Sequence, residues 1–177
     1  AINDITLADV CEEAGIPRAS AYHFFPNIEA IFLALRFLNA IEILEILATV
    51  ETKDYDRWQG YLTAIIERSV RIFYDDSTKA KLIYDTNTPD FEGDSFGEDI
   101  DLQIVELVYE LLTQRYELPN FGDVKDMLMV TFSIINGIFT LSYRRHEEIT
   151  DKYLQEATIA AIAYLRCYLP ENLPRKK

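Results

Sequence analysis

The sequence is poor in the residues that build disulfide, zinc or tight-turn architectures. It has two cysteines, Cys11 and Cys167, far apart and without a CxxC pair, which disfavours a disulfide scaffold and a zinc site and fits a reducing compartment. Six glycines and six prolines among 177 residues are too few for many short strands joined by tight turns. These shortages point away from a small secreted domain and from an all-β fold.

Basic residues are also scarce. Seventeen Lys and Arg against 30 Asp and Glu give a net charge of −13. This negative charge argues against a protein that coats nucleic acid non-specifically, but it is compatible with a local DNA-binding element. Neither histidine has a metal-ligand spacing, and no nucleophile–base pair or Gly-rich phosphate loop is present, so we expect no metal, no cofactor and no enzymatic activity.

The sequence lacks a recognisable targeting or membrane-spanning segment. Its start, AINDITLADV, has neither a basic region nor an apolar signal core. The longest uncharged stretch, Met127 to Tyr143, is shorter than the roughly 20 apolar residues of a span and contains several polar side chains. We therefore expect a cytoplasmic protein without membrane contact, in which this stretch is a buried helix.

What the sequence does contain is apolar residues at helical spacing almost throughout, which predicts an all-α fold without strands or repeats. The predicted helices cover residues 7–14, 17–24, 26–50, 54–72, 77–84, 100–118, 123–145 and 150–169. Asp54 is the expected N-cap of the fourth helix. An acidic loop is predicted from Asp85 to Asp101, either solvated or acting as a gate to a pocket, and the tail PENLPRKK is expected to fray.

The first 25 residues have the pattern of a helix-turn-helix. Thr6 and Asp9 are spaced as a capping box at the start of the first helix. Gly15 supplies the left-handed position that the turn needs, Ile16 is expected to anchor the turn in the core, and the small Cys11 lets the helices approach closely.

The second short helix would present its N-terminal end to a DNA major groove. Arg18 can pair with guanine, and Ser20 can reach a base edge or a phosphate. Aromatic, hydroxyl and helix-start groups nearby suit phosphate contact. The complete candidate DNA-binding set is Thr6, Pro17, Arg18, Ala19, Ser20, Tyr22, His23 and Asn27.

The segment ITLADVCEEAGIPRASAYHFFPNIEAIFLAL resembles the DNA-binding segment of TetR-type transcriptional regulators. The matching features are the I-T-hydrophobic start, E-E-A-G-hydrophobic, the aromatic run from Tyr22 to Phe25, and P-x-x-E-A-hydrophobic leading into a long helix. The resemblance implies a DNA-binding head at residues 1–25 and a ligand-binding and dimerisation body at 26–177 that begins with a long connecting helix. It also implies that the family's first head helix, with its basic arm, is absent from this chain.

The sequence departs from the family pattern in its charge. The position before Glu29, where the family commonly has a phosphate-contacting Lys, is Ile28, and residues 1–35 carry five acidic side chains against one basic one, Arg18. Because phosphate neutralisation dominates DNA affinity, the missing arm must supply much of the positive charge.

Aromatic residues on the predicted body helices are candidates for a ligand pocket, although most aromatics at helical spacing belong to a core. The candidate lining set is Trp58, Tyr61, Phe73, Tyr84, Tyr109, Phe132 and Phe139. Such a lining suits a small apolar or aromatic effector.

The last two helices carry small residues at near-helical spacing. These residues permit close approach in a four-helix bundle between two copies of the chain, or alternatively packing within one chain. The candidate dimer residues are Ser133, Asn136, Gly137, Thr140, Ala157, Ala160 and Ala161.

The sequence therefore predicts a homodimeric, ligand-responsive transcriptional regulator, a repressor released from double-stranded operator DNA by its effector. The alternatives are a helical regulator that acts through a protein partner, which the acidic head favours, and a helical enzyme.

Overall fold

The computed structural model describes residues 4–85, 95–120 and 122–176, and this part of the chain is almost entirely helical. The helices are α1 (Leu7–Ala14), α2 (Arg18–Phe24), α3 (Ile28–Ala48), the 3-10 helix η2 (Thr52–Asp54), α4 (Trp58–Asp75), α5 (Ser77–Tyr84), α6 (Ser95–Arg115), α7 (Val124–His146) and α8 (Asp151–Arg166). Within these described ranges no strand is formed, and the only bridge pairs Tyr116 with Arg175. The all-α prediction is confirmed.

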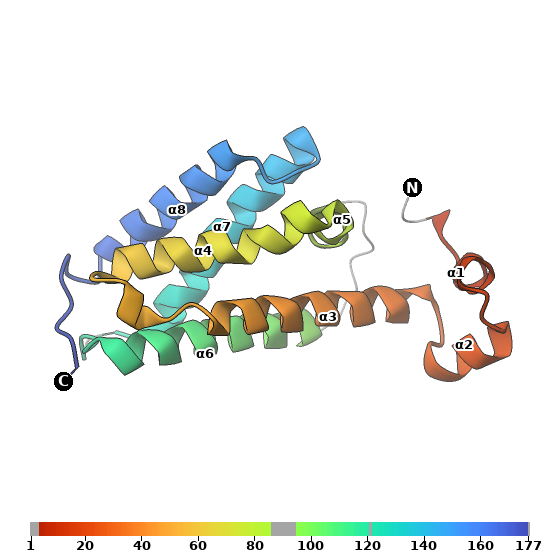
Figure 1. Cartoon of the computed structure of the whole chain (residues 1–177), viewed down its shortest axis with the longest axis horizontal. Coiled ribbons are helices and arrows are strands. Elements are labelled where there is room, and N and C mark those ends of the chain that lie inside the picture. Colours follow the sequence, from red (N-terminus) through yellow and green to blue (C-terminus); the bar gives the residue numbers. More distant parts are fainter. Residues whose placement is uncertain (1–3, 86–94, 121, 177) are drawn as a thin grey trace.

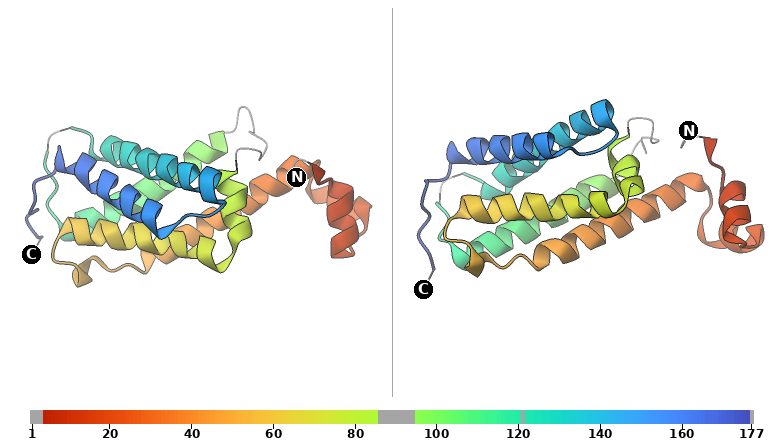
Figure 2. Two further views of the ribbon diagram at one scale, coloured as in Figure 1. Left: turned by 90° about the horizontal axis from the view of Figure 1, so that it is seen from above. Right: turned by 45° about the horizontal axis from the view of Figure 1, so that its top comes forward.

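Helix α3 joins a small region at its N-terminal end to a larger region that packs along the rest of its length (Figure 1). The short helices α1 and α2 pack on each other at its N-terminal end and form the head. The other helices gather along the rest of α3 and form the body. In the body, α3 lies beside α4 and α6, and α7 and α8 form a hairpin that packs on α4 and α6 (Figure 2).

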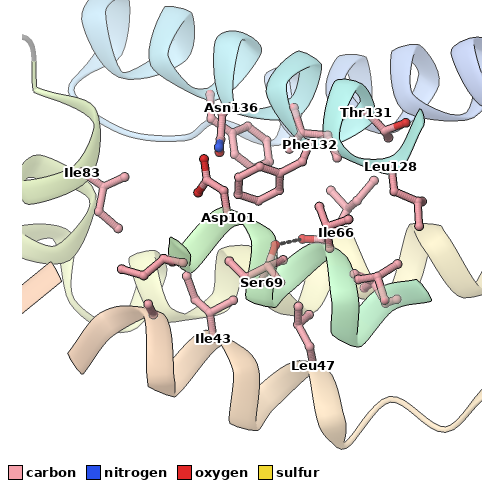
Figure 3. A pocket seen from close by; sticks show the side chains of 18 of the residues that line it. Ile43, Leu47, Ile66, Ser69, Ile83, Asp101, Leu128, Thr131, Phe132 and Asn136 are labelled. Atoms are coloured by element: carbon pink, nitrogen blue, oxygen red, sulfur yellow. Dashed lines mark hydrogen bonds between the residues drawn. The ribbon is translucent and has the colours of Figure 1, made fainter. Parts of the chain in front are cut away.

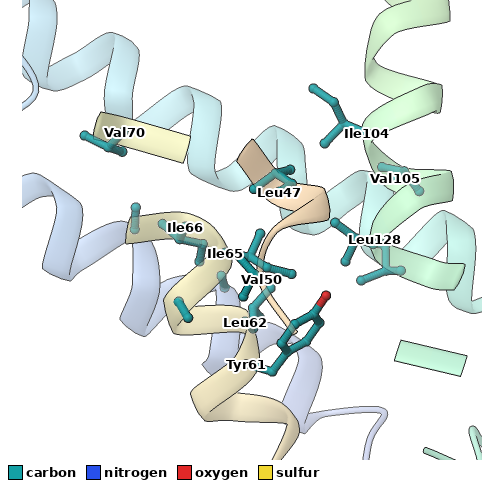
Figure 4. Close-up of a cluster of buried hydrophobic side chains, with 14 of the residues drawn as sticks. Leu47, Val50, Tyr61, Leu62, Ile65, Ile66, Val70, Ile104, Val105 and Leu128 are labelled. Carbon is teal, nitrogen blue, oxygen red and sulfur yellow. The ribbon is translucent and has the colours of Figure 1, made fainter. Parts of the chain in front are cut away.

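The body has one continuous apolar core. Side chains of α4 occupy its middle and meet residues from the end of α3, from α6 and from α7 (Figure 4). Trp58 and Tyr61 at the start of α4 are 1% and 0% exposed, so these large rings fill the end of the body remote from the head. Full burial of such rings contributes several kcal/mol, roughly 25 cal/mol per Å² of apolar surface.

The C-terminal tail is fixed along this end of the body, contrary to the expectation that it frays. Trp58 Nε1 donates to the Pro170 carbonyl and Gln59 Nε2 to the Glu171 carbonyl, both at 2.9 Å. Leu173 is buried, and the Glu117 N–H donates to the Pro174 carbonyl at 2.8 Å. The sequence of the tail is polar and rich in proline, and it gave no sign of these backbone contacts.

Six helix starts differ from their predictions: those of α2, α3, α7 and α8 by one or two residues, and those of α4 and α6 by four and five. Helix α4 begins at Trp58, with Arg57 as N-cap, because Asp54 closes η2 instead of capping α4. Helix α6 begins at Ser95, so the predicted loop from Asp85 to Asp101 is helical over its last seven residues; residues 86–94 lie outside the described part. Pro17 is the N-cap of α2 and not its first helical residue.

Helix α7 is long and apolar enough to cross a membrane, judged by length and composition alone. It exceeds the uncharged stretch predicted from the sequence because it extends to charged residues at both ends, from Val124 to His146. It packs against α5, α6 and α8, and most of its apolar side chains are buried or half-buried. Val130 and Leu141 are the exceptions, at 37% and 40% exposed.

Candidate nucleic-acid interface and internal cavity

The turn between α1 and α2 has the geometry that the sequence predicts. The Thr6 backbone N–H donates to Asp9 Oδ2 at 2.8 Å, and the Asp9 N–H donates to Thr6 Oγ1 at 3.2 Å, which completes the capping box. Gly15 has φ 65°, and the Ile16 N–H returns to the Cys11 carbonyl at 2.9 Å. Glycine adopts this left-handed conformation with the least strain, so Gly15 favours the turn between the two helices.

Hydrogen bonds from Thr6 change the chemistry of Asp9. The Thr6 hydroxyl and then its backbone N–H lower the pKa of the Asp9 carboxyl below its ordinary value. The carboxyl, which is ionised at neutral pH in any case, therefore stays ionised to a lower pH than an ordinary aspartate. Its negative charge lies in the first turn of α1, where a helix favours an anion.

Helix α2 presents nearly all of its surface to solvent. Pro17, Arg18, Ala19 and Ser20 are exposed at its N-terminal end, and no residue of the helix is buried. Tyr22 is 53% exposed, and His23 and Phe24 meet edge to face with ring centroids 5.1 Å apart. The predicted contact residues of this helix therefore lie together on one exposed element, free to meet a partner.

The two remaining candidate DNA-binding residues, Thr6 and Asn27, lie at the starts of α1 and α3. Thr6 is exposed but serves as the N-cap of α1. Asn27 is exposed and caps α3, because its Oδ1 accepts the Ala30 N–H at 2.9 Å. Both residues therefore hold helix starts whose remaining N–H groups are suited to an anion.

The head has a small interior. Leu7 and Cys11 are its buried side chains, whereas Ile5, Ile16 and Phe24 are 41%, 49% and 74% exposed. The prediction that Ile16 anchors the turn in the core is wrong, because α1 and α2 alone do not enclose it. The turn is held by Gly15 and its hydrogen bonds.

A cavity of about 160 Å³ lies inside the body, between α3, α4, α5, α6 and α7. Its lining is mainly aliphatic and aromatic (Figure 3). Four of the seven aromatic candidates line it: Phe73, Tyr84, Phe132 and Phe139. The structure brings these four residues together from three helices.

The other three aromatic candidates lie elsewhere. Trp58 and Tyr61 pack in the core near the C-terminal tail, and the Tyr61 hydroxyl has no hydrogen-bond partner there. Tyr109 is half-buried on α6 and packs against the core without lining the cavity, and the Lys125 ammonium is 4.8 Å from its ring centroid. Helical spacing identifies apolar faces but does not distinguish a filled core from a cavity wall.

Sequence reasoning missed the polar residues of the cavity. Arg36, Asp101 and Asn136 line it, together with the hydroxyls of Ser69 and Thr131. The two hydroxyls donate to carbonyls of their own helices, at 2.8 Å each. The sequence places Asp101 in a predicted loop and Asn136 on a predicted dimer face. The signal that identifies them is a charged or amide residue at the same helical spacing as its apolar neighbours.

Tyr84 connects the aromatic and the polar parts of the lining. Its hydroxyl donates to Asn136 Oδ1 at 3.4 Å, and its ring meets those of Phe73 and Phe139 edge to face. Burial, and then the negative charge of Asp101, raise the pKa of Tyr84, so the hydroxyl stays protonated. It remains a hydrogen-bond donor at any physiological pH.

The candidate dimer residues divide between the surface and the interior. Ser133 and Gly137 are exposed on α7, and a Cβ at Gly137 would meet nothing within 4 Å. Ala157 and Ala161 are both 0% exposed within one chain, because they face the body, and so cannot contact a second copy.

The remaining three candidate dimer residues are partly buried. Asn136 lines the cavity, Thr140 donates to the Asn136 carbonyl at 2.8 Å, and Ala160 is half-buried. Exposed apolar residues on the same two helices were missed, above all Ile159, which is 62% exposed.

Comparison with known proteins gives one match. Residues 2–35 match the family model described as bacterial regulatory proteins, tetR family. No curated protein and no solved structure matches the chain. The matched residues span the head and the first turns of α3. Within the described ranges, no group of three or more His, Cys, Asp or Glu side chains is placed to hold a metal ion.

Proposed function

We propose that this chain, whose residues 2–35 carry the DNA-binding domain of the tetR family of bacterial regulators, is a ligand-responsive repressor that binds its operator as a homodimer. The observation that carries the proposal is α2: a helix without a buried side chain, placed after a rigid turn, in a segment that matches a family of DNA-binding regulators. We further propose that it is a cytoplasmic protein without enzymatic activity.

The groups on α2 suit a major groove. Arg18 and Ser20 lie at its N-terminal end, where a recognition helix meets base edges, and Ala19 between them leaves room for close approach. Tyr22, His23 and the N–H groups at the start of α3 suit phosphates on either side. Arg18 would read a base, and the others would position the helix.

Helix α3 joins this interface to the cavity. It starts directly after the head, and five of its residues line the cavity at intervals of three and four: Leu33, Arg36, Ala40, Ile43 and Leu47. A helix of 21 residues is roughly 31 Å long at 1.5 Å per residue, so a tilt at the cavity moves the head. A ligand that binds one tilt more tightly than the other would therefore change the affinity for DNA.

The uncovered surface of α7 and α8 supports a homodimer. Val130, Leu141 and Ile159 are 37%, 40% and 62% exposed, and the exposed Gly137 and Ala163 permit close approach of helices. A second copy packed on this surface would bury these residues in a bundle of four helices. The two heads could then meet successive major grooves, about 34–36 Å apart.

Selection from a random duplex pool at low salt tests the proposal. The full-length protein should enrich a two-fold-symmetric motif, because two identical heads read two half-sites. The variant Arg71→Ala, which removes an exposed arginine from α4, should enrich the same motif, whereas Arg18→Ala should lose base preference within it. Failure of the full-length protein to enrich any duplex would refute DNA binding.

One observation favours a second candidate function. Residues 1–35 have five acidic side chains against a single basic one, which opposes phosphate contact and suits a basic protein partner. If this second function is correct, selection from the random duplex pool enriches no DNA motif. Substitutions on the exposed face of α2 would still change the affinity for the protein partner.

A further inference from the structure

We infer that the effector is a neutral molecule with an acceptor oxygen, such as a carbonyl, on an apolar body, and that Tyr84 donates a hydrogen bond to this oxygen. The inference rests on the ligand-responsive function proposed above. It names the chemistry of the ligand and the side chain that selects it, which the family match and the fold leave open.

The apolar surroundings set the first requirement on the ligand. Most residues around the cavity are aliphatic or aromatic, and the Phe73 and Phe139 rings meet the Tyr84 ring with centroids 5.5 and 6.1 Å away. The volume of about 160 Å³ provides room for at least one ring, since an apolar cavity of roughly 150 Å³ accepts benzene. A ligand with an apolar body therefore suits this lining.

The charged residues of the lining do not select a charged ligand. Arg36 and Asp101 have opposite charges, and both side chains are half-buried. Asp101 also has an interaction of its own within the chain. A charged ligand would lose hydration in a mainly apolar lining without gaining a matched partner, so a neutral ligand is favoured.

Two hydroxyl groups of the lining already use their protons. Ser69 donates to the Ile66 carbonyl, the bond drawn in Figure 3, and Thr131 donates to the Met127 carbonyl, both at 2.8 Å. These distances are typical of an O–H···O hydrogen bond. Transfer of either proton to a ligand would replace a good hydrogen bond with another and gain little.

The hydroxyl of Tyr84 is in a different situation. Tyr84 is 7% exposed, and its hydroxyl donates to Asn136 Oδ1 across 3.4 Å, well beyond the usual distance of about 2.7–2.8 Å. Burial, and then the negative charge of Asp101, raise the pKa of Tyr84, so the hydroxyl keeps its proton. A buried donor with a long hydrogen bond gains free energy from an acceptor at the normal distance.

The other donors of the lining depend less on a ligand. The Arg36 guanidinium and the Asn136 amide belong to half-buried side chains, which water can reach. When a ligand accepts the Tyr84 proton, the amide oxygen of Asn136 can likewise turn to water. The exchange therefore leaves no fully buried polar group without a partner, and Tyr84 is the donor that selects for an oxygen.

Acetophenone and ethylbenzene are the matched probes, because they share a phenyl ring and the length of the side chain and differ in one carbonyl group. Their affinities for the full-length protein are measured at neutral pH by ligand-detected NMR, for wild type and for Tyr84→Phe. The preference for acetophenone over ethylbenzene should fall about fivefold in the variant, the worth of one neutral hydrogen bond. Because the two proteins are compared, the different hydration of the free probes cancels.

Two further variants test the assignment. Asn136→Leu removes the present acceptor of the Tyr84 hydroxyl with little change in volume, so the preference for acetophenone should rise. The matched control Thr131→Val removes a cavity hydroxyl whose proton is already used, and it should leave the preference unchanged. Far-ultraviolet circular dichroism verifies that each variant is folded.

Charged probes test the neutral character of the ligand. Benzylamine and benzoate are close to acetophenone in size, and both should bind more weakly to wild type. Tighter binding of either one would overturn the neutral ligand.

The remaining outcomes are equally decisive. An unchanged preference in Tyr84→Phe overturns the role of Tyr84, and a preference that Asn136→Leu abolishes would assign the donor to Asn136 instead. If wild type binds neither acetophenone nor ethylbenzene, the inference fails. DNA selection by the head is measured separately, so the proposed DNA binding can hold when this inference fails.

Discussion

The head and the body use their apolar side chains in opposite ways. In the body, large rings such as Trp58 and Tyr61 are completely enclosed, and one core extends through all its helices. In the head, only Leu7 and Cys11 are buried, while Tyr22 and Phe24 are 53% and 74% exposed. The body therefore folds around its own residues, whereas most side chains in the described part of the head are exposed.

This difference indicates where stability and recognition lie. Substitution in the body should change the free energy of unfolding, since buried groups lose partners and leave cavities. Substitution on the head should change binding with little effect on folding, since exposed side chains away from caps contribute little to stability. The following predictions test that separation, from the largest effect to the smallest.

Loss of the core tryptophan should give the largest effect. Trp58→Ala removes a ring that is 1% exposed and its hydrogen bond to Pro170, so the free energy of unfolding should fall by about 3–5 kcal/mol. The matched control on the head, Phe24→Ala, should change it by less than about 0.5 kcal/mol. Urea denaturation followed by circular dichroism measures both. Equal losses would contradict the separation of the two regions.

A charge on the exposed face of α8 should break the proposed dimer. Ile159→Asp places a carboxylate on a residue that is 62% exposed in one copy, and light scattering should then give the 20.5 kDa mass of a monomer. The control Leu102→Asp alters an apolar residue on α6 that is 55% exposed and should leave the dimer intact. If wild type is itself monomeric at micromolar concentration, the dimer proposal fails.

Loss of the N-cap should weaken only the head. Thr6→Ala removes the hydroxyl that accepts the Asp9 N–H, which costs about 1 kcal/mol for a typical cap. Hydrogen exchange should accelerate at the amides of α1 and stay unchanged in α8. Acceleration in both helices would show that the head and the body unfold as one unit.

The same cap should depend on pH. Because the folded state lowers the pKa of Asp9, its contribution is present above the pKa of the unfolded chain and is lost as the pH falls through the lowered folded value. Protection of the α1 amides in wild type should therefore decrease in acid, and Thr6→Ala should reduce this pH dependence.

The smallest effect is expected at Tyr22. Tyr22→Phe removes one hydroxyl from an exposed ring, so affinity should fall a few-fold and to a similar extent for every duplex, because a phosphate contact carries no sequence information. Fluorescence anisotropy with specific and random duplexes measures this. A loss confined to one sequence would assign Tyr22 to base reading instead.

Much of the fold could be predicted because it depends on local rules. The capping box of Thr6 and Asp9 and the left-handed Gly15 each follow from a few neighbouring residues, and both are confirmed. The start of α6 was missed because the sequence from Asp85 to Asp101 is acidic and contains glycines and a proline, which is typical of a loop. The fixed C-terminal tail was missed because its contacts join residues more than one hundred positions apart.

The cavity was only partly predictable for a related reason. Periodicity shows that Trp58 and Phe73 lie on the inner side of α4, but only the packing of neighbouring helices determines that the first fills the core and the second lines a space. Small residues are similarly ambiguous: Ala161 faces inward and Gly137 faces outward, although both permit close helix approach.

The central claim is that the exposed face of α2 reads DNA, and Arg18 tests it most directly. The affinities of wild type, Arg18→Ala and the control Arg71→Ala are measured for the selected duplex and for a scrambled one at the same salt concentration. Arg18→Ala should lower the ratio of the two affinities by about 10- to 100-fold, the equivalent of one bidentate base contact, while Arg71→Ala leaves it unchanged. An unchanged ratio in Arg18→Ala would contradict the claim.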